Sequence, residues 1–90
     1  MANHKSAEKR NRQSQVRRIR NRANRTRMRN AIKVVDAAIA NGAQEDAQTA
    51  LKVAIPVIAK TAAKGTIHKK NASRKVSRLT KRVNKMMAAA

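Results

Sequence analysis

Seven arginines crowd the fourteen residues from 17 to 30, which read RRIRNRANRTRMRN and include no acid. The planar guanidinium group of arginine can donate two parallel hydrogen bonds to one phosphate, a geometry that lysine lacks. Short polar side chains that could reach phosphates, ribose hydroxyls or base edges are interleaved with these bases. They are Asn11, Gln13, Ser14, Gln15, Asn21, Asn24, Thr26 and Asn30. Any one of these amides is explained as well by solubilising an exposed helix, and only the whole pattern indicates binding of a phosphate-bearing polymer.

A second group of bases occupies residues 64–75, which read KGTIHKKNASRK. A helix that begins here would normally carry acids in its first turn, yet this stretch offers only cations. We expect a phosphate to lie there, held by free backbone N–H groups with Thr66 nearby. His68 has two interpretations that the sequence leaves open, as a phosphate contact or as a surface histidine that caps the helix.

Catalytic and metal sites find no support in the residue pattern. The two histidines are isolated, cysteine is absent, and no glycine-rich phosphate loop occurs. The acids show no paired spacing of the kind used in general acid–base catalysis. They are Glu8, Asp36, Glu45 and Asp46. We therefore expect no enzyme activity, no cofactor, no metal and no small-molecule substrate.

The net charge of +19 on 90 residues is concentrated at the two ends of the chain. Residues 1–35 carry twelve bases and one acid, residues 36–63 two bases and three acids, and residues 64–90 nine bases and no acid. Such self-repulsion favours a polyanionic partner, and nucleic acid is the leading candidate. Because no aromatic residue is present, recognition by base stacking on an aromatic platform is excluded.

Membrane association is disfavoured for separate reasons. The longest uncharged runs, such as Val53–Ala59, are far too short to span a bilayer, and no signal-peptide pattern occurs. The basic half of the first helix has only a thin apolar stripe without Trp, Phe or Leu, unlike a lipid-binding amphipathic helix. An organelle transit peptide is also disfavoured, since the basic character returns at the C-terminus.

Two glycines divide the chain into three expected helices. Asn41-Gly42 and Lys64-Gly65 are typical of left-handed helix ends, which leaves helices over about 6–40, 44–63 and 67–87. Ser6 is the expected N-cap of the first helix, and Pro56 is expected to kink the second. Each segment has a one-sided apolar stripe at helical spacing. The sequence predicts a single all-α domain over residues 1–90, an antiparallel three-helix bundle with a long, overhanging basic N-terminal helix and a proline-kinked second helix.

The overhang follows from length. At 1.5 Å per residue the first helix is roughly 50 Å long and the other two are roughly 30 Å each, so we expect residues 17–30 to project mostly beyond the bundle. Bases nearly surround this segment, which favours insertion into a groove or between two nucleic-acid segments. A solvated helix without a partner is the alternative, disfavoured because like charges four residues apart destabilise a free helix.

Several motifs resemble one family. The start MANHKSAEKR, the long arginine-rich helix, the alanine-rich middle segment with its proline, and AAKGTIHKKNASRKVSRL at residues 62–79 are similar to bacterial small-subunit ribosomal protein S20. The resemblance covers essentially the whole chain. It implies a three-helix bundle that binds 16S ribosomal RNA directly and early in assembly, with its long helix among RNA helices of the 5′ domain and near the 3′ minor domain. It also implies a monomer within the cytoplasmic ribosome with few or no protein–protein contacts.

The resemblance further implies which residues face RNA. They are Lys5, Lys9, Arg10, Arg12, Arg17, Arg18, Arg20, Arg22, Arg25, Arg27, Arg29, His68, Lys69, Lys70, Arg74, Lys75 and Arg78. Lys64 joins them from its place in the second basic group. The residues alone do not distinguish RNA from DNA, so a nucleoid-type protein that binds DNA without sequence preference is the alternative.

Overall fold

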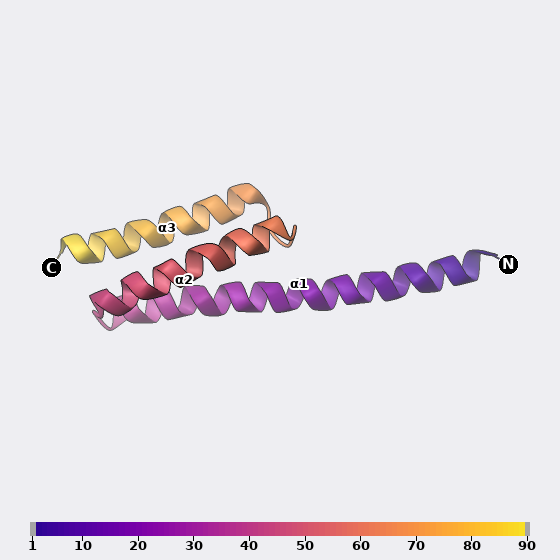
Figure 1. Ribbon diagram of the computed structural model, residues 1–90, viewed down its shortest axis with the longest axis horizontal. Helices are drawn as coiled ribbons and strands as arrows, with labels where there is room; N and C mark the ends of the chain where they lie inside the picture. The colour runs from indigo at the N-terminus through magenta and orange to yellow at the C-terminus, as the bar shows by residue number, and fades with distance from the viewer. Residues whose placement is uncertain (1, 90) are drawn as a thin grey trace.

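Three helices make up the computed structural model, which describes residues 2–89 (Figure 1). Helix α1 spans Ala2–Ala40, α2 spans Gln44–Ala63 and α3 spans Lys69–Ala88. The chain reverses direction at each turn, so α2 lies antiparallel to both of its neighbours (Figure 1). No strand occurs among the described residues. The predicted all-α, three-helix architecture is confirmed.

Glycines end α1 and α2 as their sequence context predicts. Gly42 and Gly65 have φ values of +69° and +77°, in the left-handed region that favours glycine. After α2, the Gly65 N–H donates to the carbonyl oxygen of Ala62 at 2.9 Å, and the Thr66 N–H donates to that of Thr61 at 3.2 Å. This bond pair defines a Schellman motif, and the same pair closes α1 around Gly42.

The starts of two helices differ from the prediction. Helix α1 begins at Ala2, so Ser6 lies inside the helix rather than at its N-cap, because no helix-breaking residue separates it from the preceding segment. Helix α3 begins at Lys69 instead of Ile67, since His68 has an extended backbone with φ −74° and ψ 146°.

Pro56 lies inside α2 with an exposed side chain, and the helix continues through it to Ala63. Proline lacks the N–H that would bond to the carbonyl group of Lys52, one turn earlier. The kink expected from this missing bond stays a prediction.

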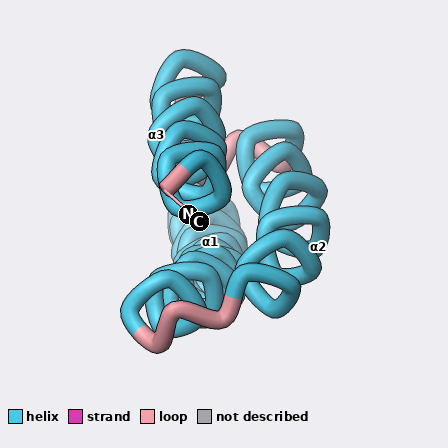
Figure 2. The backbone as a smooth tube through the Cα atoms, turned by 90° about the vertical axis from the view of Figure 1, so that its left-hand side faces the viewer, coloured by secondary structure: helices cyan, strands magenta, loops and turns pink. Residues whose placement is uncertain are grey.

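The apolar stripes of the three helices meet in one core. Val35, Ile58 and Val83, one from each helix, are its largest fully buried side chains. Helix α2 packs against both neighbours, whereas α1 and α3 touch each other least, as the end-on view indicates (Figure 2). Buried alanines, among them Ala47 and Ala54, fill much of the α2 face. The core is therefore contiguous but built largely from small side chains.

Helix α1 has 39 residues and its partners have 20 each, so one end of α1 extends beyond the bundle (Figure 1). The overhang is shorter than predicted. Because α2 rises at the same rate as α1, it covers about 20 residues of it, back to about residue 21. Asn24 and Met28 are buried, so only the first part of residues 17–30 projects freely. We call residues 5–20, all of which are exposed, the arm.

Candidate nucleic-acid interface

The arm offers cations on all sides of a helix. Seven of its sixteen residues are basic and one is acidic. Successive residues are about 100° apart, so Arg10 and Arg12 point in nearly opposite directions, as do Arg18 and Arg20. The predicted contacts in the arm, all exposed, are Lys5, Lys9, Arg10, Arg12, Arg17, Arg18 and Arg20. A helix lying on a flat anionic surface would use only one of these faces.

The second half of the arginine-rich segment lies beside the bundle. Its predicted contacts, Arg22, Arg25, Arg27 and Arg29, are exposed. They alternate with Asn24 and Met28, which are 6% and 4% exposed and hold this part of α1 against the other helices. These arginines therefore flank the buried stripe of α1 on a fixed support, with Arg27 on one side of the stripe and the other three on the opposite side.

Three polar side chains connect α1 to the turn between α2 and α3. The Nδ2 atom of Asn24 donates to the Thr66 hydroxyl at 3.4 Å, and that hydroxyl donates to Oδ1 of Asn21 at 3.2 Å. We call Asn21, Asn24 and Thr66 the polar latch. Sequence reasoning missed it and counted both asparagines only among the polar side chains that could reach nucleic acid. The missed signal is register, since Asn24 stands four residues before Met28 and continues the buried stripe of α1.

The polar latch brings distant bases together. Arg17, Arg20 and Lys64 line one hollow of about 510 Å³, with Asn21 and Asn24 between them. The sequence placed these bases in two separate groups, more than forty positions apart. Because three cations converge on this hollow without an acid among its lining residues, it favours an anionic ligand.

His68 is the N-cap of α3. Its Nδ1 atom accepts a hydrogen bond from the backbone N–H of Lys70 at 3.1 Å, which confirms the capping interpretation. That bond uses one of the backbone donors that we expected to hold a phosphate. With Nδ1 as an acceptor, a neutral ring carries its proton on Nε2, which could still donate to a phosphate oxygen. A phosphate contact from His68 stays a prediction.

Helix α3 carries the third cationic surface. Of its predicted contacts, Lys75 is partly buried, and the exposed ones are Lys69, Lys70, Arg74 and Arg78. Farther along, Arg82 donates to Asp36 of α1 at 2.7 Å, the one ion pair among the side chains of residues 5–89. Both side chains are about half exposed, so the pair adds only about 0–1 kcal/mol of stability. Its effect is to withdraw Arg82 from the free cationic surface.

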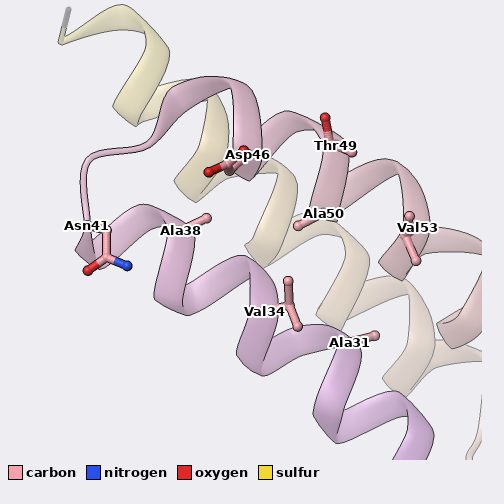
Figure 3. A pocket seen from close by; sticks show the side chains of 8 residues that line it. All are labelled: Ala31, Val34, Ala38, Asn41, Asp46, Thr49, Ala50 and Val53. Carbon is pink, nitrogen blue, oxygen red and sulfur yellow. The ribbon is translucent and has the colours of Figure 1, made fainter.

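The groove between α1 and α2 has the opposite character (Figure 3). Its volume is about 470 Å³, and Val34 and Val53 lie in its walls although each is 59% exposed. Asp46 is at the end near the first turn, and no base lines the groove. The cationic surface is therefore interrupted here, because the lining of this groove offers phosphate no cation.

The described residues provide no other recognisable chemistry. Among the described side chains, those of residues 5–89, no three His, Asp or Glu gather as a metal site would require. No described helix has the length and apolar character needed to cross a membrane. Convergent cations on helices are thus the main feature of this surface.

Comparison with known proteins gives one consistent result. The family described as "Ribosomal protein S20" matches residues 2–84. The small ribosomal subunit protein bS20 of Desulfotalea psychrophila (strain LSv54 / DSM 12343) is 62% identical over 89 residues, 99% of this chain and 100% of the relative. That of Syntrophobacter fumaroxidans (strain DSM 10017 / MPOB) is 60% identical over 84 residues, 93% of this chain and 98% of the relative. The similarity therefore extends over the arm, the bundle and both turns.

Proposed function

Because the chain belongs to the ribosomal protein S20 family, we propose that it is a structural constituent of the small ribosomal subunit and binds 16S ribosomal RNA directly. It is not an enzyme. It is located in the cytoplasmic ribosome, where it stabilises folded RNA helices during assembly.

The proposal of direct RNA binding is supported by one observation. All residues of the arm are exposed, and its bases point to all sides of the helix. Seven unpaired cations on a single helix repel one another unless phosphates surround them. An arm inserted between RNA helices neutralises both of its faces at once. Arginine suits this position because its guanidinium group makes paired contacts with phosphate oxygens.

The finer proposal concerns location. The arm lies among RNA helices of the 5′ domain of 16S ribosomal RNA and near the 3′ minor domain, while the bases of α3 contact the RNA beside the bundle. The protein acts there as a monomer with few or no protein–protein contacts. The predicted contacts on the arm, on residues 22–29, at Lys64 and on α3 are the residues that meet the RNA.

Competition binding at near-physiological salt tests this function. Labelled 16S ribosomal RNA bound to the protein is challenged separately with excess duplex DNA and with unrelated structured RNA of equal phosphate concentration. We expect the complex to survive both competitors, because the arm and the bundle together fit one folded RNA shape. Equal displacement by every polyanion would contradict the proposal and favour a nucleoid-type protein.

A further inference from the structure

Asn24 is an unusual residue for its position. It is 6% exposed in a small core made largely of alanine and aliphatic side chains. A buried amide costs free energy unless it is hydrogen-bonded, whereas an aliphatic residue here would extend the buried stripe that includes Met28. Its bond to Thr66 is 3.4 Å long and therefore weak. A contribution to stability therefore does not by itself explain why a polar residue occupies this position.

The turn that carries Thr66 differs from its counterpart at the other end of α2. Both turns are Schellman motifs around a glycine with positive φ, and in such motifs the residue after the glycine commonly makes an apolar contact. After Gly42 that residue is Ala43, which fits this pattern. After Gly65 it is Thr66, whose hydroxyl bonds to both asparagines of α1. The second turn is therefore fastened to α1 by a directional polar link.

That link adjoins two hollows that cations line. Arg17, Arg20 and Lys64 line the hollow of about 510 Å³. Arg27, Lys60 and Lys64 line a hollow of about 180 Å³. Both hollows share Lys64, which the turn carries, and Asn24 of the polar latch. Like charges disfavour the close approach of Lys64 to the arginines of α1, and the bonds of the polar latch hold the turn against α1.

We propose that the polar latch positions Lys64 between Arg20 and Arg27, so that the two hollows form one two-lobed site for the phosphodiester backbone of a single RNA strand. The inference rests on the proposed function and deepens it. The larger lobe has the volume of a small-molecule site, about 300–1,000 Å³, and takes a nucleotide, while the smaller one takes a phosphate. Arg20 and Arg27 are seven residues, or about 10 Å, apart along α1, so isolated ions would not bridge them.

Removing the hydroxyl of Thr66 tests the proposal. Thr66→Val keeps the shape of the side chain and the backbone bond to Thr61 but abolishes both latch bonds. We expect its affinity for 16S ribosomal RNA to fall about fivefold, the value of one net hydrogen bond, and its affinity for unrelated RNA to stay unchanged. Thr66→Ser restores the hydroxyl and is expected to restore binding. Thr49→Val, at an exposed threonine in the apolar groove, is the matched control and is expected to bind normally.

All variants are compared at a temperature at which circular dichroism shows them fully folded, so that lost stability is not mistaken for lost binding. If the wild type prefers 16S ribosomal RNA and Thr66→Val retains the full preference, the positioning role is wrong and the proposed function stands. If the wild type has no preference, the proposed function itself fails.

A double-mutant cycle identifies what the polar latch positions. In a Lys64→Gln background, Thr66→Val is expected to have almost no further effect on binding, because the cation that it holds is already gone. Fully additive losses would overturn the proposal. Inorganic phosphate, tested against chloride at constant ionic strength, is expected not to compete with the RNA. Strong competition would mean that the hollows take isolated anions rather than a strand.

Discussion

The side chain of His68 caps the N-terminus of α3. The first four N–H groups of a helix have no carbonyl partner inside it, and Nδ1 of His68 accepts one of them, from Lys70. Asparagine can accept the same bond through its side-chain oxygen, whereas alanine cannot. The cap matters more than usual here because the first turn of α3 carries lysines instead of acids.

We predict that His68→Ala lowers the free energy of unfolding by about 1 kcal/mol, while His68→Asn retains most of it. Urea unfolding followed by circular dichroism at neutral pH measures both variants against the wild type. Equal losses in the two variants would show that the imidazole acts through something other than the cap.

The residue type of Asn24 alone does not predict its position in the structure. It lies in the arginine-rich segment, and its type favours contact with nucleic acid. Its register, four residues before Met28, favours burial, and the structure confirms burial. The stripe of Met28, Val35 and Ala38 was predictable because apolar spacing is a local property. The bond from Asn24 to Thr66 was not, because it depends on how α2 and α3 meet α1.

The helix bounds next to the two glycines are predicted best by the sequence, whereas the starts of α1 and α3 differ from the prediction. Gly42 and Gly65 fixed the end of α1, both ends of α2 and the antiparallel order, since a left-handed cap needs glycine locally. The length of the overhang was less predictable from single segments. It depends on the pairing of two helices, and α2 covers α1 residue for residue back to about residue 21.

The two turns permit a matched prediction. Nothing lies within 4 Å of a Cβ atom built on either glycine, so an alanine there causes no clash. It destabilises the fold only through its positive φ, by about 1–2 kcal/mol. We predict that Gly42→Ala and Gly65→Ala lower the free energy of unfolding by similar amounts, measured by thermal unfolding. Only Gly65→Ala is expected to weaken binding to 16S ribosomal RNA, because only that turn carries Lys64. Equal weakening of binding by both substitutions would contradict this division.

Along the length of the molecule, the residues that form the core and the residues available for binding lie at different ends. Its described residues extend over 69 × 22 × 14 Å, with the core at one end and the arm at the other. Three of the four acids lie in the segment with the fewest bases, residues 36–63. The core therefore supports the bundle, and most of the charge is left for a partner. This partition was predictable from composition, but the position of each cation relative to RNA was not.

The central claim is that the arm lies within the RNA rather than on its surface, and the salt dependence of binding tests it most directly. Arg10 and Arg12 lie on nearly opposite faces of the arm, about 160° apart. Arg10→Gln and Arg12→Gln are each measured with 16S ribosomal RNA across a salt series, with Lys52→Gln, on the exposed side of α2, as the control. Loss of one phosphate contact lowers the slope of log affinity against log salt by about one unit. We predict that the slope falls by about one unit for both arm variants and stays unchanged for the control. A reduced slope for only one of the two arm variants would contradict insertion and place the arm on the RNA surface.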